Sequence, residues 1–261
     1  MTTRARWLGV SGYEIEGPNH RILVDPFLSE NPMAPVDHEE LERPDVILVT
    51  HAPFDHMGDT SAIAKRTGAP VVCGGDVRLA LIDQGVPESQ ITPTIWGISI
   101  QLGDLTVRPV ECHHWSSYQL ASGEMLAGVP LAWIFETEPG VRFYHFGDTA
   151  IFDMNLIGEL YEPTVGLLGC GLPVELLDRT PGPGHPVTGE LTADEAGRVA
   201  EMLGVRIAVA GHYLGHTPET DLFADAVARH DPTGNRQAIV PTVGDTLVFE
   251  GEKCWIEKET I

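Results

Sequence analysis

Lysine is nearly missing from this chain, and negative charge dominates it. Only three of the 16 basic residues are lysine, and 38 acidic residues leave a formal net charge of -22. A field of that sign repels the phosphate backbone of nucleic acids and the anionic headgroups of lipids. We therefore expect neither a nucleic acid nor a membrane as a partner.

Cysteine is scarce, and long apolar runs are absent. The four cysteines are isolated and form no Cys-x-x-Cys pair. This spacing excludes a zinc ribbon or a disulfide framework and favours a reducing compartment. No stretch reaches the roughly 20 apolar residues that span a bilayer, and the first ten residues lack a signal-peptide core. The sequence predicts a soluble, cytoplasmic protein and leaves homo-oligomerisation open.

The 261 residues form strand-rich and mixed segments in alternation, which favours one domain over residues 1–261. Apolar periodicity and turn residues predict an opening meander, a first set of alternating strands and helices, and a polar, helical connector at 37–42. The predicted strands of this half are 7–10, 13–16, 21–25, 46–50 and 70–73, and its helices are 61–67 and 76–83.

The second half starts with hairpins and then returns to helices. Hairpins are predicted at 98–110 and 131–146, and a third closes the chain at 246–257. Thr192 and Glu195 have the spacing of a capping box, and Thr217 before Pro218 begins a second helix beyond the strand at 205–210. This order predicts an α/β fold in which two mixed β-sheets pack face to face with helices on the outer faces, an αββα sandwich.

Polar residues that can bind metal follow the strand at 46–50. His51, Asp55 and His56 lie within six residues, in the loop that is predicted after it. Two imidazoles and a carboxylate at the carboxyl end of a buried strand indicate a metal site. The alternative is an ordinary polar loop whose histidines happen to be close in sequence.

Three further strand ends have the same character. His113 and His114 follow one strand, His145 and Asp148 end another, and His212 follows a third. Such ends can converge on one edge of a layered fold, where ligand sites usually lie. A single histidine after a strand is more often a hydrogen-bonded surface residue, but four such ends together favour a site.

Several motifs occur in a characteristic order. They are Trp7-Leu-Gly, Ile22-Leu-Val-Asp-Pro-Phe27, Val49-Thr-His51 with Asp55-His56, His114-Trp-Ser116, His145-x-Gly-Asp148 and Ala210-Gly-His-Tyr213. This set resembles the metallo-β-lactamase fold superfamily, and most of all the branch of L-ascorbate 6-phosphate lactonase and N-acyl phosphatidylethanolamine phospholipase D. The resemblance runs over nearly the whole chain.

The resemblance implies two neighbouring metal positions that share one carboxylate. The first position would use His51 and His114, and Asp148 would bridge to the second. The second position would add Asp55, His56 and His212. Imidazoles and carboxylates suit Zn²⁺, which we expect first, and also Mn²⁺ or Fe²⁺, with one or two ions per chain.

The chain departs from the family pattern at one position. The second histidine of the family falls at Pro53, whose side chain cannot bind metal. The protein could use the second position only, recruit a substitute such as His113, His185 or His216, or bind no catalytic metal. We favour a weakened or empty first position, in which His51 acts as a general base or contacts substrate.

Other polar residues have supporting roles in this interpretation. The motif match favours His114 as the ligand and leaves His113 to packing or a substrate contact. His145 is expected behind the ligands. Asp25 either orients a metal-bound histidine or is a solvated turn residue. His185, in a Gly/Pro-rich loop, is a further candidate for a contact with substrate.

The resemblance implies a metal-dependent hydrolase. A metal ion lowers the pKa of a bound water from about 15.7 toward about 7, and the hydroxide attacks a carbonyl or phosphorus centre. The expected catalytic residues are Asp55, which would move a proton, His51 and Asp148. We expect a small-molecule ester, lactone or amide as substrate. The alternatives are a phosphodiesterase, a non-hydrolytic metalloenzyme and a non-catalytic binding protein on the same scaffold.

Overall fold

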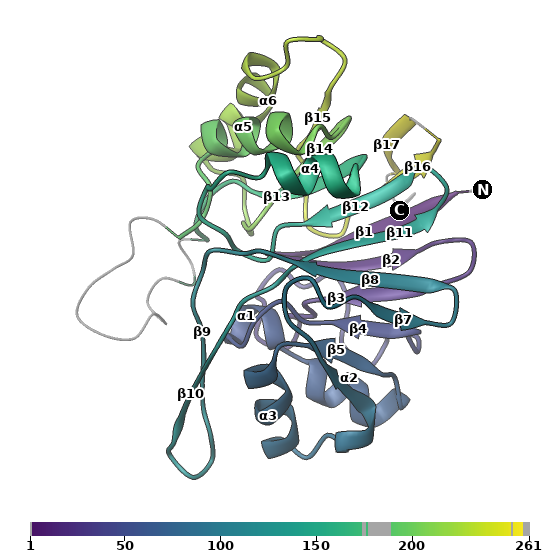
Figure 1. Cartoon of the computed structure of the whole chain (residues 1–261), viewed down its shortest axis with the longest axis vertical. Coiled ribbons are helices and arrows are strands. Elements are labelled where there is room, and N and C mark those ends of the chain that lie inside the picture. Colours follow the sequence, from purple (N-terminus) through teal and green to yellow (C-terminus); the bar gives the residue numbers. More distant parts are fainter. Residues whose placement is uncertain (1, 174–175, 177–188, 252, 258–261) are drawn as a thin grey trace.

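Two mixed β-sheets form the centre of the molecule in the computed structural model, which describes residues 2–173, 176, 189–251 and 253–257 (Figure 1). The strands of the larger sheet are β1 (Thr3–Gly9), β2 (Gly12–Glu16), β3 (Arg21–Val24), β4 (Val46–Leu48), β5 (Val71–Cys73), β6 (Ile91–Pro93), β16 (Thr246–Glu250) and β17 (Lys253–Glu257). Their order across the sheet is β17-β16-β1-β2-β3-β4-β5-β6.

The second sheet comes from the middle and the end of the chain. Its strands are β7 (Ile100–Leu102), β8 (Leu105–Val110), β11 (Ala132–Glu138), β12 (Val141–His145), β13 (Val165–Gly169), β14 (Ile207–Gly211) and β15 (Gln237–Ile239). Their order is β15-β14-β13-β12-β11-β8-β7. A separate hairpin of β9 (Ser116–Gln119) and β10 (Met125–Gly128) projects from the sandwich (Figure 1).

Helices cover the outer faces of both sheets (Figure 1). They are α1 (Phe54–Met57), α2 (Thr60–Thr67), α3 (Gly75–Asp83), the short 3₁₀ helix η1 (Glu88–Gln90), α4 (Asn155–Tyr161), α5 (Ala193–Leu203) and α6 (Pro218–Arg229). The predicted αββα sandwich is therefore confirmed. Within the described parts of the chain, no helix has the length and apolar character needed to cross a membrane.

The strand β4 is buried on both of its faces. Val46 and Leu48 are buried in the core between the two sheets, whereas Ile47 belongs to the cluster formed with α2 and α3. Successive side chains of a strand point to opposite faces, so a strand covered on both sides must be apolar throughout. The apolar run at this position is explained by that double burial.

Some sequence predictions need correction. Residues 37–42 form turns instead of a helix, because the Asp37 carboxylate accepts a hydrogen bond from the Glu39 amide (2.8 Å) and closes an Asx turn. The strand predicted to Thr50 ends at Leu48, since the Thr50 amide donates to the Asp25 carboxylate (2.8 Å). The capping box predicted at the start of α5 and the helix start predicted at Thr217 and Pro218 are confirmed, and Thr217 forms a second capping box with Thr220.

The topology brings distant strand ends to one edge. β3, β4 and β5 run parallel in the larger sheet, and β12, β13 and β14 run parallel in the other. Ligand sites in such sheets lie at the carboxyl ends of parallel strands. The loops after β3, β4, β12 and β14 carry the residues described next.

Candidate metal centre

The segment after β4 supplies three of the predicted residues. His51 lies in the loop, and α1 carries Asp55 and His56, which were expected in a loop instead of a helix. This single turn begins at Pro53, whose carbonyl accepts hydrogen bonds from the amides of His56 (3.1 Å) and Met57 (2.9 Å). The turn places Asp55 and His56 on the same side as His51, as the ligand sets below require.

Asp25 holds this segment in place through hydrogen bonds. Its buried carboxylate accepts hydrogen bonds from Thr50 Oγ1 (2.6 Å) and from Nδ1 of His56 (2.9 Å). Thr50 Oγ1 lies 2.9 Å from Nδ1 of His51 as well. Bonds to Nδ1 fix the tautomer and leave Nε2 available to a metal, as carboxylates behind metal-bound histidines do. Of the two interpretations of Asp25, the solvated turn is wrong.

The loop after β12 places Asp148 at the centre of the site. A Cβ on Gly147 would lie 2.1 Å from the carbonyl oxygen of Leu131, so only glycine fits there. Asp148 itself has a left-handed φ of 58°, and its buried carboxylate accepts a hydrogen bond from Ser11 Oγ (3.2 Å). A strained, buried carboxylate of this kind is typical of functional sites.

His114 and His212 approach from two other strand ends. His114 follows β8, and its Nδ1 lies 3.2 Å from the Gly189 carbonyl oxygen. His212 follows β14 with a left-handed φ of 62°, and its Nδ1 lies 3.0 Å from the Gly171 carbonyl oxygen. A carbonyl can only accept, so each Nδ1 is protonated and each Nε2 remains available.

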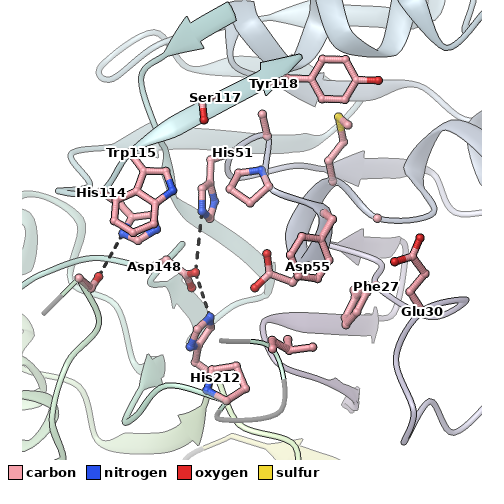
Figure 2. Close-up of a pocket in the computed structure, with 18 of the residues that line it drawn as sticks. Phe27, Glu30, His51, Asp55, His114, Trp115, Ser117, Tyr118, Asp148 and His212 are labelled. Atoms are coloured by element: carbon pink, nitrogen blue, oxygen red, sulfur yellow. Dashed lines mark hydrogen bonds and ion pairs between the residues drawn. The ribbon is translucent and has the colours of Figure 1, made fainter. Parts of the chain in front are cut away.

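The predicted ligands form two overlapping groups. Figure 2 labels His51, Asp55, His114, Asp148 and His212 of these groups. Within each group the candidate ligand atoms lie within 4.8 Å of one another. The groups are Asp55, His56, Asp148 and His212, and His51, His114 and Asp148. Asp148 belongs to both, as a bridging carboxylate would.

The geometry of these atoms suits a cation. Asp148 Oδ2 lies 2.6 Å from His56 Nε2, 2.9 Å from His212 Nε2 and 3.8 Å from His51 Nε2. Ligand atoms about 2.0–2.1 Å from a tetrahedral zinc ion are roughly 3.4 Å apart. Among the described residues none of these three Nε2 atoms has a partner with hydrogen-bond geometry, despite the short distances. Buried nitrogens that converge on one carboxylate oxygen in this way are those that an ion would satisfy.

The electrostatics divide the histidines into two kinds. Burial, together with the neighbouring His56, lowers the pKa of His51 well below its usual value. Burial also disfavours the charged forms of His56 and His212, but the Asp148 carboxylate outweighs it. The pKa of His56 is therefore well above its usual value, and that of His212 is raised to about 10. Burial alone would raise the pKa of Asp148, but the charges on His212 and His56 hold it well below its usual range. Without an ion, protons supply the positive charge that this carboxylate requires.

Glu190 is a buried residue that the sequence did not single out. Its Oε2 lies 3.8 Å from Nδ1 of His212, and its Oε1 lies 4.0 Å from Nδ1 of His114. Burial, with the charge of Asp148, raises its pKa well above the usual value. Glu190 therefore lies behind one histidine of each group. It precedes the capping box of α5 and belongs to no recognised motif, so only the fold reveals it.

The other predicted residues lie outside the two groups. His113 stacks on Phe152 (4.2 Å between ring centroids), and its Nε2 lies 2.7 Å from a carboxylate oxygen of Glu111. His145 is buried, with Nε2 2.8 Å from the Ser11 carbonyl oxygen, so it lies behind the residue that bonds to Asp148. His185 falls outside the described residues.

All members of the two groups except His56 line a cavity of about 740 Å³. Pro53 lines the same cavity, together with His51 and His114. The indole of Trp115 stacks over His114 with ring centroids 4.4 Å apart. A cavity of this volume is in the range that accommodates small molecules.

The sandwich and its His and Asp groups place the protein in the class of metal-dependent hydrolases with the metallo-β-lactamase fold. A family model described as the Beta-lactamase superfamily domain matches residues 20–230. A UPF0173 metal-dependent hydrolase of Rubrobacter xylanophilus is 36% identical over 225 residues, which cover 83% of this chain and 86% of that protein. The chain belongs to the β-lactamase superfamily and, within it, to the UPF0173 metal-dependent hydrolases.

Two further similarities agree with this assignment. A UPF0173 metal-dependent hydrolase of Methanopyrus kandleri is 37% identical over 212 residues, covering 80% of this chain and 84% of that protein. The solved structure of Igni18, described as a metallo hydrolase from Ignicoccus hospitalis, superposes with a TM-score of 0.73 and 26% identity. That superposition covers 96% of this chain and 99% of Igni18.

Proposed function

We propose that the protein hydrolyses a small-molecule ester, lactone or amide at the edge where the two groups meet. The single observation that carries this proposal is the pair of groups sharing Asp148 on the wall of the large cavity. The likeness of the motifs to the lactonase branch supports an acyl substrate. The hydrolase names of the relatives support the reaction type.

The two positions differ in how well they can hold an ion. Asp55, His56, Asp148 and His212 would hold an ion at the second position, for which Zn²⁺ is proposed and Mn²⁺ or Fe²⁺ are alternatives. A divalent ion there would polarise the electrophilic carbon and supply an activated water. The other position retains His51, His114 and Asp148, with Pro53 in place of a third imidazole. We propose that it is weak or empty.

The chain's own residues would handle the protons. The side chain of Asp55 is 15% exposed and lines the cavity, whereas that of Asp148 is 3% exposed. Asp55 is therefore the carboxylate that solvent reaches, and it would accept a proton from the attacking water. The neutral His51 lines the same cavity and would serve as a general base or hold the substrate carbonyl.

Metal analysis and turnover by single variants test the proposal. The purified, unchelated protein is assayed for bound metal and for hydrolysis of a panel of lactones, esters, amides and phosphodiesters. We expect Asp148→Asn and His212→Ala to lose both the metal and the metal-dependent hydrolysis. Asn tolerates the left-handed backbone at position 148. Asp153→Asn, at an exposed turn before α4, is the matched control. If both site variants kept metal and activity, the proposed centre would be wrong.

A further inference from the structure

The walls of the cavity beyond the metal groups are largely apolar. Aromatic and thioether side chains make up much of this wall, which we call the apolar wall: Phe27, Phe54, Met57, Trp115, Tyr118 and Met125. Phe27 and Phe54 meet edge to face, with ring centroids 5.7 Å apart, and close one side. An apolar wall of this extent binds hydrocarbon or aryl groups by removing them from water.

Carboxyl groups are numerous among the described residues that line the cavity. These residues include no lysine or arginine, and their carboxyl groups include those of Asp55, Asp59, Asp148 and Glu190. The Asp59 carboxylate is held in place by hydrogen bonds from the amides of Leu28 (2.7 Å) and Ser29 (2.9 Å). Among the described residues that line the cavity, a substrate with a phosphate or a second carboxylate would therefore meet positive charge only at the metal centre.

We propose that the substrate is uncharged and that its acyl or aryl part lies on the apolar wall, with the β9–β10 hairpin setting substrate preference. This inference rests on the proposed function and names the substrate class of the same site. It separates neutral esters or amides from phosphorylated and dicarboxylic ones.

The hairpin is fixed where it meets the metal centre. Ser116 Oγ accepts a hydrogen bond from the Ala52 amide (3.0 Å), next to His51, and donates one to the Asp76 carboxylate. Farther along, the Tyr118 hydroxyl accepts a hydrogen bond from Gln84 Nε2 (3.2 Å). These bonds join the hairpin to the loop after β4 and to the end of α3.

Met125 begins the second strand of the hairpin and is the residue best suited to a test. It is 63% exposed and still lines the cavity. Substitution there changes the wall without disturbing a packed core, since most of the side chain already contacts solvent.

Matched p-nitrophenyl esters test the substrate class on the metal-loaded protein. We expect kcat/KM to rise about fourfold per methylene along the acetate, butyrate and hexanoate series, from burial of each added group. The hemisuccinate ester, which has a carboxylate in place of the terminal methyl group of butyrate, should be at least tenfold poorer than butyrate. Equal or better turnover of the hemisuccinate would overturn the inference.

A binding measurement keeps the inference separate from the proposed function. Calorimetry compares N-hexylacetamide with N-(5-carboxypentyl)acetamide on the same metal-loaded protein. We expect the neutral amide to bind at least tenfold more tightly, and tighter or equal binding of the carboxylate would refute the substrate class. A neutral preference in binding without any turnover would refute the proposed hydrolysis and leave the substrate class standing.

A lysine at the hairpin tests the role of the wall itself. Met125→Lys should raise kcat/KM for the hemisuccinate about tenfold and lower it for hexanoate. Met33→Lys adds the same charge at a residue that is 44% exposed and does not line the cavity. This control should leave both substrates unchanged. If both variants raised hemisuccinate turnover equally, the overall charge of -22 would explain the preference and the assignment to the hairpin would fail.

Discussion

Restoring a histidine at Pro53 should create a second tight metal position. Pro53 has φ −52° and ψ 154°, an extended conformation open to histidine, and its side chain lines the cavity with His51 and His114. Its helix-starting hydrogen bonds use the carbonyl oxygen, which the substitution retains. Pro53→His therefore adds an imidazole beside the group of His51, His114 and Asp148 with little rearrangement.

The effect of Pro53→His on the free energy of unfolding should change sign when metal is added. Loss of the proline costs about 0.4–1 kcal/mol through the unfolded chain. An added ion at 100 times its Kd stabilises the folded state by about 2.7 kcal/mol. With excess Zn²⁺ the variant should thus be about 2 kcal/mol more stable than the unsubstituted protein, a rise in Tm of roughly 4–8 °C. In chelator the variant should be less stable than the unsubstituted protein, by about 0.4–1 kcal/mol for the lost proline alone.

Elemental analysis and thermal unfolding measure both effects. We expect one tightly held ion per chain in the natural sequence and two in Pro53→His. Pro53→Ala removes the same ring without adding a ligand, so it should be destabilised with and without metal. Two tight ions in the natural sequence, or a histidine variant that behaves like the alanine variant, would refute our interpretation of Pro53.

Three further predictions concern the support of the site and the rest of the fold. Glu190→Gln keeps the shape of the side chain but removes a carboxyl group behind His114 and His212. Metal affinity should therefore fall about 10–100-fold, while the Tm of the chelated protein stays the same. A lower Tm without a change in metal affinity would show that Glu190 has only a structural role. Thr192→Ala removes the capping box of α5 and should cost about 1 kcal/mol, or roughly 2–4 °C in Tm. Burial raises the pKa of Cys170 and Cys254 to about 12, and it also raises the pKa of the other two buried thiols. All four thiols should fail to react with a disulfide reagent at pH 8 until the protein unfolds. Rapid labelling of the folded protein would contradict this prediction.

The layers of the fold could be predicted from sequence because their signals are local. Apolar strands, Gly-containing hairpin turns and capping residues each act within a few positions, as the capping box at Thr192 shows. The β9–β10 hairpin could not be predicted in this way. Met125 and its neighbours alternate between exposed and half-buried positions, and the hairpin is fixed by contacts of Ser116 with Ala52 and Asp76, which are distant in sequence.

The residues of the site divide in the same way, into those that local sequence signals identify and those that only the fold brings together. Residues such as His51 and His212 could be chosen because each directly follows a strand end. Glu190 gave no signal, since its position behind two histidines exists only once β8, β14 and the start of α5 have come together. The choice between His113 and His114 came from the motif, and the structure places His114 in a ligand group and His113 against Glu111.

The substitution at position 53 connects the metal centre with the apolar wall. A histidine there would add a polar ligand to the first position, whereas proline adds hydrocarbon to the same surface beside Phe54 and His114. The second position does not depend on the side chain of residue 53, because the imidazoles of its histidines are fixed by Asp25 and by the Gly171 carbonyl. Proline at this one position can therefore weaken the binding of one ion and extend the apolar surface toward the reacting atoms. That pairing is expected if the substrate is uncharged, because an added apolar contact stabilises a neutral acyl group by removing it from water.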